Sequence, residues 1–247
     1  MIDIHCHVLP GVDDGASDLE CAVQMLESAA ANGIGRIICT PHSAPDMAEK
    51  INQAFSKLDP LAVSLGIRIA CGVEYSYGHL HGDPKELRSL AGTSFLLLDL
   101  GCPELPPTIV ELFFSLECSG LQIIIAHPER YLKSLDTCEE LSRLGAFFQL
   151  NAGSILGEYG KQCRRMAEKM IENGYCHYVA SDAHGRNRTF RLRECRQCLA
   201  QNFGEEFASQ VLGKNQELLL NNQLPITLVP QKANRKFFCF FRKNKPL

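Results

Sequence analysis

The sequence predicts an α/β fold in which seven strand–helix units form a barrel resembling the (β/α)8 type but one unit short. Short apolar runs alternate with longer amphipathic stretches along almost the whole chain, which is typical of repeated strand–helix units around a parallel sheet. The chain has 247 residues, and single barrels of about 200 to 250 residues fold as one domain. We therefore expect one barrel domain over residues 1–230.

The strands are expected at short runs rich in branched or aromatic side chains. These runs cover residues 2–5, 36–40, 68–72, 95–99, 122–126, 147–150 and 177–180. The clearest helix spans residues 18–32, where Ser17 can cap the start and Gly33 can end it. Further helices are predicted over residues 47–65, 107–119, 131–144, 161–173 and 190–202, followed by two short pieces that end near Asn221.

Composition describes an ordinary globular protein. The net charge is -3, without the basic excess of a nucleic-acid binder. The first residues lack a cationic segment followed by an apolar run, so we expect a cytoplasmic protein. The twelve cysteines stand mostly singly in apolar stretches, which indicates reduced thiols. For the close pair Cys195 and Cys198, packing is favoured over a zinc or redox role.

The composition changes at the C-terminal end. Residues 231–247 form a basic aromatic tail in which six lysines and arginines surround four phenylalanines. Such a segment can lie on an anionic membrane, at the inner face of the cell membrane, or dock on a partner. The alternative is a frayed end or a strip packed on the barrel, and composition does not decide between them.

Side chains that bind metals follow almost every predicted strand. Barrels of this type assemble their active site from the loops at the carboxyl ends of the strands. The candidates at this rim are His5, His7, His42, Glu74, Asp99, His127, Asn151, Asp182 and His184. A single histidine is more often structural, but the same feature at the end of so many separate strands indicates a metal site.

The residue types also indicate a reaction. Imidazoles mixed with carboxylates suit manganese, iron or zinc. Clustered cations of this kind promote phosphoester hydrolysis, and arginines match phosphate oxygens with a planar fork of donors. Arg130 follows His127, and Arg188 follows His184, with Arg186 and Arg191 as less favoured competitors.

Three other histidines are poorer ligand candidates. His79 and His81 form a second H-x-H pattern, but they lie in a Gly-rich loop away from a strand end, where substrate contact is slightly favoured over metal binding. His177 precedes an apolar strand and is expected to be structural.

Several motifs resemble a known family. The segments Ile2-Asp3-Ile4-His5-Cys6-His7 and Gly11-Val12-Asp13-Asp14-Gly15 resemble the signature of bacterial protein-tyrosine phosphatases of the polymerase-and-histidinol-phosphatase (PHP) superfamily, which occur in capsule and exopolysaccharide loci. Further matches are Thr40-Pro41-His42, Gly72-Val73-Glu74, Ala126-His127-Pro128-Glu129-Arg130-Tyr131, Leu150-Asn151-Ala152-Gly153-Ser154 and Ala180-Ser181-Asp182-Ala183-His184. The resemblance covers roughly residues 1 to 222.

The resemblance implies a distorted, TIM-like (β/α)7 barrel with three manganese ions (Mn2+). The first ion would be held by His5, His7, Glu74 and Asp182, the second by Glu74, Asp99 and His127, and the third by Asp14, His42 and His184. Arg130 and Arg188 would bind the substrate phosphate. Asp99 stands where the family usually has a glutamate, which predicts weaker or altered binding of the second ion; Glu104 is a less favoured substitute.

The function implied is removal of phosphate from phosphotyrosine in a protein. By resemblance, the substrate is the tyrosine-rich tail of a bacterial tyrosine kinase that controls capsule or exopolysaccharide synthesis. Two alternatives stay open at this point. One is a small-molecule PHP phosphatase acting on histidinol phosphate or a nucleotide, and the other is a non-catalytic metal-binding regulator.

Overall fold

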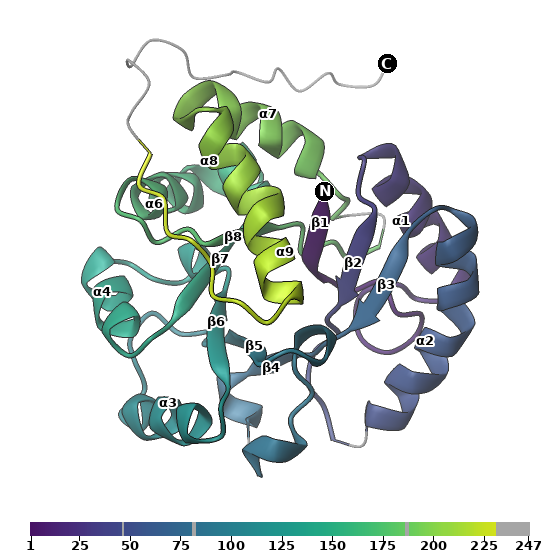
Figure 1. Cartoon of the computed structure of the whole chain (residues 1–247), viewed down its shortest axis with the longest axis horizontal. Coiled ribbons are helices and arrows are strands. Elements are labelled where there is room, and N and C mark those ends of the chain that lie inside the picture. Colours follow the sequence, from purple (N-terminus) through teal and green to yellow (C-terminus); the bar gives the residue numbers. More distant parts are fainter. Residues whose placement is uncertain (46, 81–82, 186–187, 231–247) are drawn as a thin grey trace.

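Parallel strands lie at the centre of the molecule, and helices surround them (Figure 1). The structure is a computed structural model that describes residues 1–45, 47–80, 83–185 and 188–230. The strands are β1 (Ile2–Cys6), β2 (Arg36–Cys39), β3 (Arg68–Cys71), β4 (Glu74–Ser76), β5 (Phe95–Asp99), β6 (Gln122–Ala126), β7 (Phe147–Asn151) and β8 (Tyr178–Ala180). The parallel α/β arrangement expected from the sequence is therefore confirmed.

The strands are divided between two sheets, of order β1-β2-β3 and β4-β5-β6-β7-β8. The predicted strand at residues 68–72 is one half of an interrupted strand, because β3 pairs with β2 whereas β4 pairs with β5. Gly72 lies in the interruption, where an added Cβ would be 2.7 Å from Leu90 Cδ2 and 3.3 Å from Leu90 Cα, so a larger residue there would have to displace the Leu90 side chain.

Hydrogen bonds beyond the named strands connect the two sheets at both junctions. At one junction, the amide of Asp182 donates to the carbonyl of His5, and the amide of His7 donates to the carbonyl of Ala183, both at 2.9 Å. At the other, the amide of Glu74 donates to the carbonyl of Pro41 at 3.0 Å. The segments that follow β1 and β2 therefore lie beside the second sheet.

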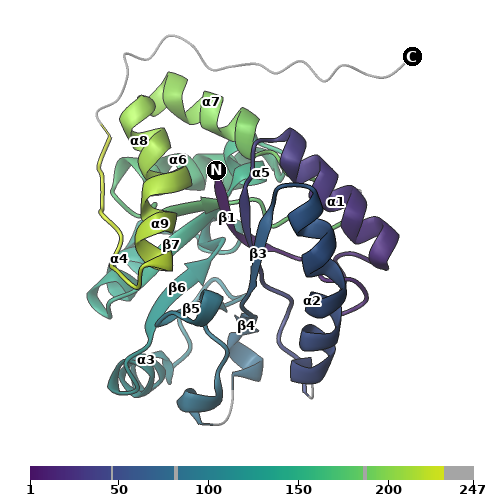
Figure 2. The ribbon, with the colours of Figure 1, turned by 45° about the vertical axis from the view of Figure 1, so that its right-hand side comes forward.

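The helices lie mostly where the sequence predicts them (Figure 2). They are α1 (Leu19–Ala31), α2 (Met47–Ser64), α3 (Ile109–Cys118), α4 (Leu135–Arg143), α5 (Ala152–Leu156), α6 (Gly160–Glu172), α7 (Leu192–Phe203), α8 (Glu205–Ser209) and α9 (Asn215–Leu220). Helix α1 is capped by Asp18, which accepts from the amide of Cys21, and not by Ser17. Helix α4 starts four residues later than predicted because Pro128–Arg130 forms a 3-10 turn and Ser134 provides the cap.

Strands β5, β6 and β8 direct alternate side chains to two separate apolar clusters. Phe95 and Leu97 of β5 belong to a small cluster with Leu219 of α9, whereas Leu96 and Leu98 belong to the larger cluster between strands and helices. This period of two is the pattern of strands buried on both faces. None of the helices in the described ranges is both long and apolar enough to cross a membrane.

Candidate functional site

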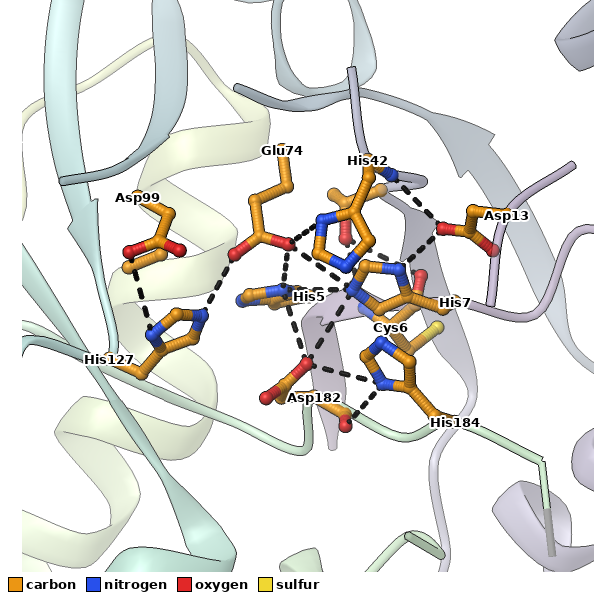
Figure 3. Close-up of polar contacts among 12 residues, drawn as sticks. His5, Cys6, His7, Asp13, His42, Glu74, Asp99, His127, Asp182 and His184 are labelled. Carbon is orange, nitrogen blue, oxygen red and sulfur yellow. Dashed lines mark hydrogen bonds and ion pairs between the residues drawn. The ribbon is translucent and has the colours of Figure 1, made fainter. Parts of the chain in front are cut away.

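The carboxyl ends of the strands bring the predicted ligands together in one site (Figure 3). All nine residues predicted as ligands belong to at least one of four groups whose ligand atoms lie within 4.8 Å of one another. The junction between β1 and the segment after β8 sets His5 and His7 beside Asp182 and His184. Asn151, also at this rim, donates through its Nδ2 to Asp182 Oδ2 at 2.7 Å.

Four buried side chains form the centre of the site. His5 Nε2 and His7 Nε2 lie 3.2 Å apart. Glu74 Oε2 lies 3.3 Å from the first of these nitrogens and 3.4 Å from the second. Asp182 Oδ1 lies 3.5 Å from both. Two imidazoles and two carboxylates from strand ends of both sheets therefore point at the same small volume.

Two further groups flank this centre. On one side, His127 Nε2 lies 2.8 Å from Glu74 Oε1, and its Nδ1 lies 4.0 Å from Asp99 Oδ1. On the other side, the Nε2 atoms of His42 and His184 each lie 3.4 Å from Asp14 Oδ1. Asp14 is largely exposed, so this side of the site opens to solvent.

Two of the candidate ligands have a left-handed backbone. The φ angle is 34° at His127 and 52° at Asp182. Residues other than glycine rarely adopt a left-handed backbone, and those that do are concentrated at functional sites. His127 directly follows β6 and Asp182 lies two residues after β8, so both left-handed residues stand where the chain turns away from a strand end.

The donor set fits divalent cations. Glu74 Oε2 lies within 3.4 Å of nitrogens of three histidines, yet it makes no hydrogen bond. His127 Nδ1 and His184 Nε2 are likewise buried without a hydrogen-bond partner in the described part of the chain. Buried lone pairs that converge without donors are costly unless a cation binds them, and mixed imidazole and carboxylate ligands suit manganese, iron or zinc.

The charges within the site shift the pKa values of its members. Burial opposes protonation of His5, but the charges of Glu74 and Asp182 raise its pKa to about 10. Burial also opposes ionisation of these two carboxyls, yet the charge of His5 holds the pKa of Glu74 well below its usual range and helps to lower that of Asp182 to about 2. Burial and the charge of His7 lower the pKa of His184 to about 4. The carboxylates are therefore ionised at neutral pH, where a cation competes with the proton of His5.

Both predicted arginines reach this centre. The Nη1 atoms of Arg130 and Arg188 donate to Asp182 Oδ2 at 3.1 and 3.3 Å. Arg130 also lies over the ring of Tyr159, 5.3 Å from its centroid. Both arginines line a cavity of about 370 Å³ together with five of the candidate ligands and Tyr131.

Of the competing residues that the structure describes, none belongs to a candidate ligand group, and Arg191 does not line the cavity with Arg130 and Arg188. Arg191 is paired with Glu158 and Glu194. His79 belongs to none of the four ligand groups. His177 accepts from the amide of Phe148 and contacts Thr227, as expected of a structural histidine. Glu104 is also absent from the described ligand groups. Arg186, His81 and the tail at residues 231–247 lie outside the described residues.

Sequence reasoning missed the residues that hold the ligands. Asp13 Oδ2 lies 2.6 Å from His7 Nδ1 and accepts from the amide of His42. Gln149 Oε1 lies 2.8 Å from His5 Nδ1. Asp13 is adjacent to Asp14 in the Gly-Val-Asp-Asp-Gly motif, and Gln149 precedes Asn151 by two positions on one strand. Strand alternation could therefore have identified Gln149, whereas the direction of the Asp13 side chain depends on a loop.

The chain is similar to known proteins over most of its length. Residues 1–221 match the family described as capsular polysaccharide synthesis, CpsB/CapC. The chain is 35% identical to the tyrosine-protein phosphatase YwqE of Bacillus subtilis, over 98% of this chain and 100% of that protein. It is 31% identical to the putative tyrosine-protein phosphatase CapC of Staphylococcus aureus, over 96% and 99% of the two chains.

A solved structure is also similar. It comes from a study of YwqE from Bacillus subtilis and CpsB from Streptococcus pneumoniae, described as unique metal-dependent tyrosine phosphatases. The TM-score is 0.80 at 31% identity, and the match covers 95% of this chain and 100% of the other. With the family match over most of its length, the chain belongs to the CpsB/CapC family of capsular polysaccharide synthesis.

Proposed function

We propose that the protein is a metal-dependent phosphatase that removes phosphate from phosphotyrosine in a protein. The observation that carries the proposal is the pair of guanidinium groups, Arg130 and Arg188, that line one cavity with five candidate metal ligands. The similarity to tyrosine-protein phosphatases over nearly the full chain supports phosphotyrosine as the substrate. A non-catalytic regulator would not need both arginines beside an intact ligand set.

We assign the ligands to three manganese ions. His5, His7, Glu74 and Asp182 would hold the first ion, Glu74, Asp99 and His127 the second, and Asp14, His42 and His184 the third. When bound, such ions would activate a water and neutralise phosphoryl charge. The four ligand groups support more than one ion, and the same donors would also accept iron or zinc.

The protein's own residues bind and orient the phosphate. Each arginine uses Nη1 to contact Asp182, which holds the guanidinium plane at the cavity wall. The other N–H groups of the fork can then donate to phosphate oxygens in two parallel hydrogen bonds. Stacking of Arg130 on Tyr159 restricts its rotation further.

The proposed partner is a tyrosine-phosphorylated bacterial tyrosine kinase involved in capsule or exopolysaccharide synthesis, and nucleic acid is not a proposed partner. The membership in a capsule synthesis family supports this partner. We also propose that the two sheets act as one distorted, TIM-like (β/α)7 barrel over residues 1–230, supported by the hydrogen bonds at both junctions.

The protein would act in the cytoplasm, at the inner face of the membrane, with the basic aromatic tail at residues 231–247 contacting anionic lipid. Pelleting with vesicles of anionic lipid should carry down the full chain and leave a chain truncated after Gln231 in solution. Equal pelleting of both proteins would contradict membrane contact through the tail.

The test of the enzymatic proposal uses metal-stripped protein with manganese added back. The substrates are a phosphotyrosine peptide, histidinol phosphate and a nucleoside monophosphate. Arg130→Met should lower kcat/KM for the peptide on the order of 100-fold, because it removes a preorganised donor but keeps the aliphatic chain. The control is Arg191→Met, which removes an arginine paired outside the site. Turnover of the small molecules alone would indicate a metabolic phosphatase, and no turnover would indicate a regulator.

A further inference from the structure

A chain of buried amide side chains connects two of the candidate ligands. His5 Nδ1 lies 2.8 Å from Gln149 Oε1, Gln149 Nε2 lies 2.8 Å from Asn151 Oδ1, and Asn151 Nδ2 lies 2.7 Å from Asp182 Oδ2. His5, Gln149 and Asn151 have 0% exposure and Asp182 has 1%. Gln149 and Asn151 are two positions apart on β7, so both point to the same face of that strand.

The direction of each hydrogen bond in this chain follows from its end. An ionised carboxylate is an acceptor only, so the group of Asn151 that faces Asp182 must be the amide NH2. The carbonyl oxygen of Asn151 then faces Gln149 and requires its NH2 group, which turns the Gln149 carbonyl oxygen toward His5. That oxygen can only accept, so His5 Nδ1 must carry a proton. Nε2, which faces Glu74 and Asp182, is then the atom of His5 that can bind a cation.

The same series of hydrogen bonds decides which oxygen of Asp182 is available to bind a cation. Asp182 Oδ2 accepts from Asn151 Nδ2 and from both arginines. Oδ1 is left facing the imidazoles of His5, His7 and His184 at 3.4 to 3.5 Å. The backbone amide of Asn151 is itself held, because it donates to the buried Glu129 Oε1 at 2.9 Å. A hydrogen bond therefore fixes the end of β7 that carries these amide side chains.

We propose that Gln149 and Asn151 are positioning residues that form a directional relay between His5 and Asp182. The relay fixes the Nδ1–H tautomer of His5 and reserves Asp182 Oδ1 for the cation. It rests on the metal-dependent function proposed above, and it adds that the affinity for the cation depends on two amide side chains that cannot themselves be deprotonated. Such partners of metal ligands typically change metal affinity about 10- to 100-fold when they are removed.

The first experiment measures manganese affinity by calorimetry in the full chain. Gln149→Leu removes both hydrogen bonds at similar volume and should weaken manganese binding about 10- to 100-fold. Gln149→Glu keeps an acceptor for His5 Nδ1 and should bind manganese more tightly than Gln149→Leu. Asn151→Asp sets a carboxylate against Asp182 Oδ2 and should weaken binding although its shape is unchanged.

The matched control is Gln210→Leu. Gln210 is also buried and donates to an asparagine, Asn215 Oδ1, at 2.7 Å, but this pair lies away from the site. Gln210→Leu should lower thermal stability and leave manganese affinity unchanged. If Gln149→Leu and Gln210→Leu have the same manganese affinity, the relay is overturned, whatever their stabilities.

The second experiment reads the tautomer directly. Nitrogen-15 NMR of zinc-loaded protein should show a protonated Nδ1 on His5 in the wild type and in Gln149→Glu. A protonated Nε2 on His5 in the wild type would overturn the relay. If the wild type binds manganese through these residues but does not hydrolyse phosphotyrosine, the proposed function fails while the relay stands, so the two failures are distinguishable.

Discussion

Replacing Gly15 with alanine should displace His7 and thereby weaken both metal binding and catalysis. Gly15 follows the candidate ligand Asp14, and the amide of Ala16 donates to the carbonyl of His7 at 2.9 Å. The chain segments at His7 and at Ala16 therefore lie side by side next to Gly15. The φ angle of Gly15 is not in the left-handed region, so alanine is compatible with the backbone and the effect is steric.

The structure gives the size of the displacement. A Cβ added at Gly15 would lie 2.0 Å from the carbonyl oxygen of His7 and 2.4 Å from its Cβ, whereas such contacts essentially never fall below 3.0 Å. Neither atom can rotate away, since one is backbone and the other is fixed to it. Relief therefore requires a movement of about 1 Å, and a misplacement of that size in an active site costs about 100-fold in rate.

The assay compares manganese affinity and kcat/KM for a phosphotyrosine peptide in Gly15→Ala and wild type. Gly35→Ala is the control, because Gly35 has nothing within 4 Å of an added Cβ and no left-handed φ angle. We expect about 100-fold lower kcat/KM in Gly15→Ala and no change in Gly35→Ala. Wild-type kcat/KM and affinity in Gly15→Ala would refute the steric reasoning.

Three further predictions follow from single contacts. Asp99→Glu should tighten manganese binding about 10-fold, equivalent to 1.4 kcal/mol, because Asp99 Oδ1 lies 4.0 Å from His127 Nδ1 and a longer side chain can shorten this distance. Calorimetry that shows equal manganese affinities in the variant and the wild type would contradict this. Tyr159→Leu should lower kcat/KM roughly 5-fold through lost stacking of Arg130, whereas Tyr159→Phe should retain it. Burial lowers the pKa of His177 from 6.5 to about 4. As the pH falls, His177 is therefore protonated in the unfolded chain before it is protonated in the folded chain. The free energy of unfolding should therefore fall by up to about 3 kcal/mol between pH 6.5 and 4, measured by urea denaturation against His177→Gln, which should lack this decrease.

The sequence was sufficient to predict the candidate ligands that lie at the ends of strands. His5, His7, Glu74 and Asp182 could be found because parallel strands end at a common rim, so a residue at each end is brought to one place. Asp99 and His127 follow for the same reason. The two predicted arginines required the family resemblance as well, since their distance from a strand end leaves their direction open.

The sequence could not supply features that depend on contacts between distant segments. The strand is interrupted at Gly72, which lies against Leu90, and no local pattern records this contact between separate segments. Helix α1 is capped by Asp18 and not, as predicted, by Ser17, because both side chains can accept a hydrogen bond from a backbone amide and the loop geometry decides which of them does. Asp13 was passed over because its neighbour Asp14 carries the same side chain.

The division of the strands into two sheets has a consequence for the order in which the molecule comes apart. His5, His7 and His42 belong to the ends of the first sheet, whereas Glu74, Asp182 and His184 belong to the second. Outside the site, the sheets are also connected by hydrogen bonds at the two junctions, by Ser181, which donates to Asp3 of β1, and by the small apolar cluster that strands of both sheets share. Cations held between them would strengthen this connection at the rim, so chelation should increase hydrogen exchange first at the amides of Asp182 and Glu74, before the strand interiors exchange.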